Sequence, residues 1–253
     1  MAVDFRLDGR VAVITGSSRG IGEAIARTFA AYGAKVVVSS RKQDACEAVA
    51  ASIKAAGGEA TAVACHTGST KDINVLFEKT LAAYGRVDVL VNNAATNPYF
   101  GDVLHISESQ FDKTFEVNTK GYFFTAQKAA TIMAAQHKGC IINIASIAGL
   151  EGPPMQGVYG MTKAAVILMT KAYAKELGAF GIRSNAICPG LTETKFAKVL
   201  IDTPAIHDMA VKGIPLGRHG QPDEMAGAAL WLASDAGSFT NGAIIVIDGG
   251  ATC

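Results

Sequence analysis

The stretch VAVITGSSRGIG, residues 11–22, joins an apolar run rich in β-branched residues to a turn that contains three glycines. Helix-forming residues follow directly, in AIARTFAAYG at 24–33. Glycines let a ligand approach the backbone, and the first turn of a helix offers unpaired N–H groups to a pyrophosphate. Alone, the spacing G-x-x-x-G-x-G would also fit an ordinary turn, but its place between a strand and a helix favours a nucleotide site. We expect these loop residues to bind a cofactor: Gly16, Ser18, Arg19, Gly20, Ile21 and Gly22.

The alternation of strand and helix continues along the chain. Further apolar runs of strand length occupy 35–40, 59–65, 87–92, 140–146, 183–188 and 243–248. Segments with helical character lie between them, at 21–33, 44–58, 72–85, from about 107, at 158–181 and at 222–234. Near-continuous apolar strands separated by helices are typical of a parallel sheet buried on both faces. The sequence therefore predicts an α/β fold, a single doubly wound (Rossmann) sheet of about seven parallel strands with helices on both faces.

We expect residues 1–253 to form one dinucleotide-binding domain, because no linker or low-complexity segment interrupts this alternation. Four glycines stand where helices are expected to end: Gly33, Gly58, Gly85 and Gly181. The segment from about 190 to 215 departs from the pattern, since it is rich in proline and glycine. We expect it to form a mobile cover over the substrate site.

The composition excludes several classes of partner. Among 253 residues, 49% are apolar and the formal charge is +1, which disfavours nucleic acid or an anionic membrane surface as the main partner. The N-terminal segment MAVDFRLDGR has no apolar signal region, and no apolar run approaches the ~18 residues of a membrane span. Five scattered cysteines lack a C-x-x-C pair, and five histidines lack metal-ligand spacing. We expect a cytoplasmic protein with reduced thiols and no metal.

The end of the second strand indicates which dinucleotide would bind. An acidic residue at this position normally binds the ribose 2′-hydroxyl of NAD(H). Here the strand ends in Ser39 and Ser40, with Arg41 and Lys42 following, and Arg19 in the glycine turn can reach the same place. Guanidinium groups suit a 2′-phosphate. Although Arg41 and Lys42 would also fit a solvated helix start, we expect Ser40, Arg41 and Arg19 to select NADP(H).

A tyrosine and a lysine stand one helical turn apart in YGMTK, residues 159–163. Tyr159 and Lys163 therefore share one helix face. Both side chains could simply cover apolar surface. A nearby ammonium also lowers the pKa of a phenol, by about 1 to 3 units from about 10, which would make the tyrosine a usable acid or base.

These segments, in this order, resemble the short-chain dehydrogenase/reductase family over essentially the whole chain. The matching pieces are TGSSRGIG (15–22), NNAA (92–95), FEVNTKG (115–121), IASIAG (144–149), YGMTK (159–163), CPGLTET (188–194) and NGAIIVIDGG (241–250). Ser146 precedes Tyr159 by 13 residues and Lys163 follows it by four, as the active site of that family requires. VVVSSRKQ, CHTG and NNAATNPYFG look like the NADP-dependent carbonyl and retinal reductase branch.

The resemblance implies roles for individual residues. Tyr159 corresponds to the proton donor, Ser146 to the group that hydrogen-bonds the substrate carbonyl, and Lys163 to the residue that lowers the tyrosine pKa and binds the nicotinamide ribose. Asn118 corresponds to the asparagine that holds a water in the proton relay. The remaining cofactor positions are Asn92, Asn93, Ala94, Pro189, Gly190 and Thr192. Two departures stand out: His66 replaces an aspartate near the adenine, where it could stack or be an ordinary loop residue, and Ala95 replaces a glycine.

The expected function is an NADP(H)-dependent oxidoreductase that moves a hydride between the nicotinamide and a small-molecule carbonyl or secondary alcohol. A 3-oxoacyl-(acyl-carrier-protein) or 3-oxoacyl-CoA reductase shares every motif, and it should have a basic patch, for which Lys195, Lys198, Lys212 and Arg218 are candidates. A non-catalytic nucleotide-binding redox sensor is a third alternative. The resemblance also implies a homotetramer. Apolar residues in 95–101, 147–157 and 190–215, among them Phe196, suggest an apolar pocket but name no substrate or reaction direction.

Overall fold

The computed structural model describes residues 3–194, 208 and 210–253. Within these residues, seven strands form one parallel sheet in the order β3-β2-β1-β4-β5-β6-β7. The strands are β1 (Val11–Thr15), β2 (Lys35–Ser40), β3 (Glu59–Ala64), β4 (Val89–Asn92), β5 (Gly139–Ile144), β6 (Ile182–Pro189) and β7 (Ile244–Ile247). The strand order reverses between β1 and β4, which is the switch point of a doubly wound sheet. The predicted fold class is confirmed.

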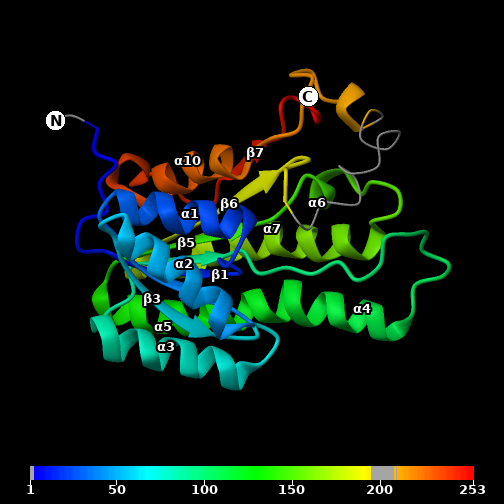
Figure 1. Ribbon diagram of the computed structural model, residues 1–253. Helices are drawn as coiled ribbons and strands as arrows, with labels where there is room; N and C mark the ends of the chain where they lie inside the picture. The colour runs from blue at the N-terminus through cyan, green and yellow to red at the C-terminus, as the bar shows by residue number, and fades with distance from the viewer. Residues whose placement is uncertain (1–2, 195–207, 209) are drawn as a thin grey trace.

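Helices cover both faces of the sheet (Figure 1). They are α1 (Gly20–Ala31), α2 (Gln43–Ala55), α3 (Thr70–Tyr84), α4 (Glu108–Phe115), α5 (Gly121–Gln136), α6 (Ala148–Glu151), α7 (Gly157–Leu177) and α10 (Pro222–Ala233). Helices α1, α2 and α10 pack on one face, whereas α3, α5 and α7 pack on the other. Alternate strand residues supply the two cores: Ala12 and Ile14 point to the first and Val13 to the second. This two-sided burial explains the continuous apolar runs.

The helix expected from about 107 is divided in a way that the sequence did not indicate. Ser107 caps α4 in a reciprocal capping box with Gln110. A π-helical turn, η1 (Glu116–Lys120), then connects α4 to α5. Single π turns inside helices often mark functional sites. Here the turn carries Asn118.

Two boundary expectations need correction. Gly33 and Gly85 have positive φ at helix ends, but after α2 the left-handed residue is Gly57 rather than Gly58. The helix predicted over 158–181 ends at Leu177, and a 3-10 turn (η2, Gly178–Phe180) precedes Gly181. Most of the expected cover, 195–207 and 209, including Lys195, Phe196 and Lys198, lies outside the described residues.

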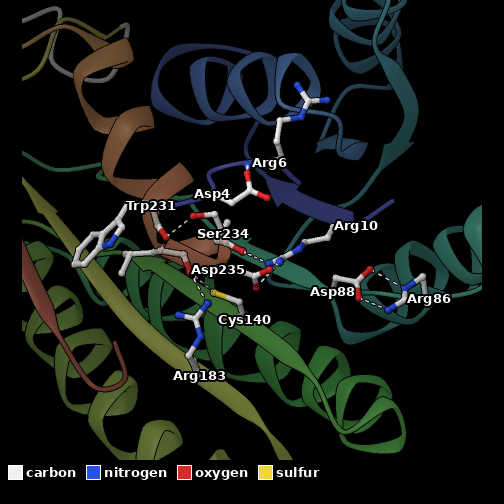
Figure 2. A network of polar contacts seen from close by, with 12 residues as sticks. Asp4, Arg6, Arg10, Arg86, Asp88, Cys140, Arg183, Trp231, Ser234 and Asp235 are labelled. Atoms are coloured by element: carbon white, nitrogen blue, oxygen red, sulfur yellow. Dashed lines mark hydrogen bonds and ion pairs between the residues drawn. The ribbon is translucent and has the colours of Figure 1, made fainter. Parts of the chain in front are cut away.

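Arginines secure the edge of the sheet at which the strands begin (Figure 2). Arg10 donates to the Ala233 carbonyl at 2.6 Å and pairs with Asp235. Arg183 donates to the Leu232 carbonyl at 2.7 Å. These carbonyls belong to the last turn of α10, where the helix dipole favours positive charge. The polar network thus lies at the amino edge, opposite the edge where open α/β sheets bind ligands.

Candidate active site

The turn between β1 and α1 is built around glycines that tolerate no side chain. Gly16 and Gly20 have φ of 64° and 58°, the left-handed region. A Cβ on Gly22 would lie 2.6 Å from the Gly16 carbonyl and even closer to Asn93. A Cβ on Gly20 would lie 3.2 Å from the Thr194 side chain, so the segment after β6 meets the turn. The turn therefore has no room for side chains at these glycines, and its backbone lies directly against the end of β4 and the segment after β6.

The asparagines after β4 hold this turn in place. Asn93 Nδ2 donates to the carbonyls of Thr15 and Gly16 at 2.9 and 3.1 Å. The backbone N–H groups of Asn93 and Ala94 both donate to the Thr15 hydroxyl. Asn92 is buried and bonds to Asn143 at 3.0 Å. Their side chains are therefore committed to bonds within the protein, and the backbone of this segment is what borders the turn.

Exposed arginines follow both β1 and β2, in the connections that leave the carboxyl edge of the sheet. Arg19 and Arg41 are exposed, and neither forms an ion pair with another residue in the described part of the chain. Arg19 occupies the N-cap of α1 without a capping side chain, which leaves the first N–H groups of that helix accessible. Ser40 at the end of β2 bonds to Cys46 Sγ at 3.2 Å. These features fit a phosphorylated dinucleotide: the glycine turn would hold its diphosphate, and the two arginines its 2′-phosphate.

His66 follows β3 and belongs to a polar cluster. Its Nδ1 lies 3.0 Å from the Gly68 N–H, and its Nε2 lies 3.1 Å from Lys113 Nζ. Lys113 also pairs with Glu116 at 2.8 Å. The family resemblance implies that His66 lies near an adenine, but the sequence gives no sign of Lys113 and Glu116, because they come from α4 and the π turn, about 50 residues away in the chain.

Ser146, Tyr159 and Lys163 meet at the carboxyl edge of β5. Ser146 lies two residues beyond the strand, whereas Tyr159 and Lys163 lie on one face of α7. A hydrogen bond links the side chains of Ser146 and Tyr159. Lys163 Nζ lies 5.7 Å from the centre of the Tyr159 ring and donates to the Ile144 carbonyl at 2.7 Å. The structure therefore brings together three residues that the sequence analysis selected as a group.

Burial controls the electrostatics of this group. It raises the pKa of the Tyr159 phenol to about 12, and the hydrogen bond with Ser146 acts in the opposite direction. Burial also lowers the pKa of the Lys163 ammonium to about 7. From the sequence, the Lys163 ammonium is expected to lower the pKa of the Tyr159 phenol. In the structure, desolvation of the phenol outweighs any such effect, and Ser146 is the neighbour that favours the phenolate.

Asn118 is fully buried on the π turn. Its Oδ1 accepts from the Thr96 N–H at 2.8 Å, and its Nδ2 donates to the Thr96 carbonyl at 2.9 Å. Nδ2 also contacts the Thr162 hydroxyl at 3.2 Å, on the helix that carries Tyr159 and Lys163. Asn118 therefore fastens the segment after β4 to α7.

The segment after β6 also lies at the carboxyl edge of the sheet, beside Ser146. Pro189 is buried, and its carbonyl accepts from the Ile147 N–H at 3.2 Å. The Thr192 hydroxyl donates to the Gly190 carbonyl at 3.0 Å. Pro189, Gly190 and Thr192 therefore lie at the same edge of the sheet as Ser146.

A small pocket opens beside Tyr159, and most of its lining is apolar. Its wall comes from the segments 99–106 and 155–158, including Tyr99, Val103, Ile106, Met155 and Val158. Asp102 is the one carboxylate of this lining in the described chain, and it bonds to His105 at 2.8 Å.

Two kinds of feature are absent from the described residues: a membrane-spanning helix and a cluster of metal ligands. No helix in that part of the chain is long and apolar enough to cross a membrane. No group of three or more His, Cys, Asp or Glu side chains gathers there as metal ligands would.

Fold and site together define the class of protein: an oxidoreductase on a doubly wound α/β domain. A family model described as enoyl-(acyl carrier protein) reductase matches residues 16–252. Dehydrogenase/reductase SDR family member 4 of Bos taurus is 37% identical over 245 residues, covering 97% of this chain and 88% of that protein. The 3-oxoacyl-(acyl-carrier-protein) reductase of Thermotoga maritima is 38% identical over 247 residues, covering 97% and 98%.

The solved structures agree with the sequence relatives. A gluconate 5-dehydrogenase from Burkholderia cenocepacia, in complex with NADP and tartrate, superimposes with a TM-score of 0.95 at 36% identity, covering 99% of this chain and 98% of that one. The chain belongs to the short-chain dehydrogenase/reductase family.

Proposed function

We propose that the protein is an NADP(H)-dependent reductase of small-molecule ketones or aldehydes that also oxidises the corresponding secondary alcohols. The observation that carries this proposal is the Ser146–Tyr159 hydrogen bond beside the buried ammonium of Lys163, at the carboxyl edge of the sheet. A cytoplasmic homotetramer remains part of the proposal.

Bound NADPH would supply the hydride, and the chain's own residues would position the substrate and supply the proton. The Ser146 hydroxyl would donate to the substrate carbonyl oxygen, and the Tyr159 phenol would protonate that oxygen as it gains charge. Lys163 would place its ammonium close to the phenolate that remains. Asn118 holds α7 and the segment after β4 together, which would keep Tyr159 and Lys163 aligned.

Selection of NADP(H) rests on Arg19, Arg41 and Ser40. Arg19 is the N-cap of α1 and Arg41 directly follows β2; both residues are exposed, and the end of β2 carries Ser40 instead of a carboxylate. The solved gluconate 5-dehydrogenase relative contains NADP, which is consistent with this assignment.

A 3-oxoacyl-thioester reductase is the second candidate, supported by the relative from Thermotoga maritima. One expectation for that function is weakened. Arg218, a candidate for a basic patch, forms a bidentate pair with Glu224 at 2.7 and 2.8 Å. Its charge is therefore partly neutralised within the protein. A non-catalytic nucleotide sensor is disfavoured by the retained serine, tyrosine and lysine.

The test is a panel of initial rates with NADPH and with NADH on an α-dicarbonyl, an aryl ketone, retinal and acetoacetyl-CoA. We expect NADPH-dependent turnover of the neutral ketones, and a preference for acetoacetyl-CoA would instead establish the thioester reductase.

Tyr159→Phe should still bind NADPH but lose about 100-fold to 10,000-fold in kcat. Tyr173→Phe, which removes a phenol elsewhere on α7, is the matched control. Full activity of Tyr159→Phe would contradict the proposed proton donor.

A further inference from the structure

A second tyrosine lies beside Lys163, and the proposed chemistry does not use it. Tyr122, in the first turn of α5, is only 1% exposed. Its hydroxyl donates to the Ile144 carbonyl at 3.0 Å and accepts from Lys163 Nζ at 3.3 Å. Lys163 donates to the same carbonyl at 2.7 Å. Phenol, ammonium and carbonyl therefore form a closed triangle at the end of β5.

The ring of Tyr122 contributes as well as its hydroxyl. Lys163 Nζ lies 4.9 Å from the centre of the Tyr122 ring and 5.7 Å from that of Tyr159. The ammonium thus lies near two aromatic rings, from α5 and from α7. Cation–π attraction and the accepted hydrogen bond both favour the charged form of a lysine, whereas burial opposes it.

We propose that Tyr122 is a positioning residue for Lys163: its hydroxyl and ring hold the buried lysine side chain at Ile144 and keep it charged within reach of Tyr159. This proposal rests on the proposed function, because it concerns how the same site is prepared for proton transfer. Packing alone does not require the hydroxyl, since phenylalanine would fill the same space without burying a polar group.

The other groups that face Lys163 offer no substitute for Tyr122. Tyr159 lies on the same helix as Lys163, and Cys188 comes from β6. Burial raises the pKa of the Cys188 thiol to about 11 and that of the Tyr122 phenol well above its ordinary value, so both are neutral near pH 7. No carboxylate contributes to the electrostatics of Lys163 among the described residues. Neutral acceptors and aromatic faces are therefore what support this ammonium, and Tyr122 provides one of each.

The test compares wild type with Tyr122→Phe, which keeps the ring and removes the acceptor. We expect the pKa of Lys163 to fall further, by about one unit, because a charged group loses one hydrogen bond. As the pH is raised, the rate of carbonyl reduction with NADPH should therefore begin to fall about one pH unit earlier in Tyr122→Phe than in wild type. The defect should be about fivefold at pH 7, approach about tenfold above pH 8, and largely disappear about two pH units below neutrality. A purely structural defect would instead be uniform across the pH range.

A second readout needs no cofactor. The unfolding free energy of wild type should rise with pH above the folded-state pKa of Lys163, and in Tyr122→Phe this rise should begin at lower pH. Tyr173→Phe is the matched control, because its hydroxyl donates to the Phe123 carbonyl at 3.2 Å and forms no bond with Lys163.

The two readouts separate the proposals. Superimposable stability and activity profiles for Tyr122→Phe and wild type would overturn the positioning role, as would an equal shift in Tyr173→Phe. The stability profile of Tyr122→Phe could shift even if the protein neither binds nor turns over NADPH. That result would confirm that Tyr122 positions Lys163, and it would refute only the proposed function.

Discussion

Lys163 shows how one residue connects stability to chemistry. It is 1% exposed, and its ammonium bonds to a neutral carbonyl and a neutral phenol. A charge in such surroundings is destabilising, which is the reason its pKa lies at about 7 instead of 10.5. A protein under selection for stability alone would place an apolar residue here.

Lys163→Met should therefore stabilise the protein while it impairs turnover. Because the folded-state pKa is below the unfolded-state value, the unfolded chain binds more protons between about pH 7 and 10.5. Wild-type stability accordingly rises with pH across this window, and the penalty is complete below pH 7. We expect Lys163→Met to gain about 1 to 3 kcal/mol in urea unfolding at pH 6, with a smaller gain at pH 9. The Tyr122 hydroxyl still donates to Ile144, so no carbonyl is orphaned. A loss of stability at pH 6 would contradict this account.

Arg41 is the residue at which cofactor selection can be measured. Arg41→Ala should weaken NADPH binding about 10-fold to 100-fold and leave NADH binding nearly unchanged, because only NADPH carries the 2′-phosphate. Fluorescence titration with each nucleotide gives the two dissociation constants. Arg27→Ala, which removes the same charge from an exposed position on α1, is the control. An unaltered ratio of the two constants would show that Arg41 is only a solvated surface residue.

The turn between β1 and α1 gains its shape from other elements as well as from its glycines. Asn93 and Thr15 tie it to the end of β4, and Thr194 lies against Gly20 from the segment after β6. Three crossovers of the chain therefore meet at one edge, next to the switch point between β1 and β4. This convergence explains why a parallel sheet with short loops can form a cofactor cradle.

Gly22→Ala should disturb this junction. The added methyl group would clash with Asn93 and with the Gly16 carbonyl, so the turn and the end of β4 must separate. We expect a loss of about 1 to 3 kcal/mol in thermal or urea unfolding, together with weaker nucleotide binding. Gly227→Ala is the contrasting variant, because nothing lies within 4 Å of its Cβ on α10. That change should stabilise the protein by about 0.5 to 1 kcal/mol. Equal effects of the two substitutions would refute the packing argument.

In the molecule as a whole, the stabilising polar contacts and the candidate active site lie at opposite edges of the sheet. At the amino edge, Arg10 and Arg183 bind the carbonyls of the last turn of α10, and Arg86 pairs with Asp88 before β4 (Figure 2). At the carboxyl edge lie the glycine turn, Ser146 and the segment after β6. Residues at the amino edge can therefore change stability with little direct effect on the reacting groups.

The proposed homotetramer is a prediction at this scale. Large apolar side chains are exposed on the two longest helices of the described chain: Phe123 on α5 is 40% exposed, and Leu168 on α7 is 69% exposed. Sedimentation velocity should show a tetramer, and Leu168→Asp should reduce its size because a carboxylate would be buried at the interface. Leu216→Asp, at a position 68% exposed outside these helices, is the control. A monomeric wild type would refute the expectation.

The sequence by itself determined the class of fold and selected the candidate residues of the site. Apolar periodicity decided the seven strands, because a strand buried on both faces must be apolar throughout. Spacing alone placed Tyr159 and Lys163 on one helix face, and the turn between β1 and α1 needed only local glycine chemistry. All of these depend on residues that are near one another in the chain, where pattern and structure are directly related.

The tertiary structure decided what depends on burial and on distant contacts. Asn93 was expected to line a cofactor, yet its side chain holds the glycine turn, because that turn comes to lie beside it only in the folded sheet. The tyrosine pKa was expected to fall and instead rises, because no sequence pattern reports how completely a phenol is desolvated. Tyr122 had no signal in the sequence, since its partners Lys163 and Ile144 come from other elements. Electrostatics in a protein interior depends on which neutral and charged groups are packed together, and only the folded chain fixes that.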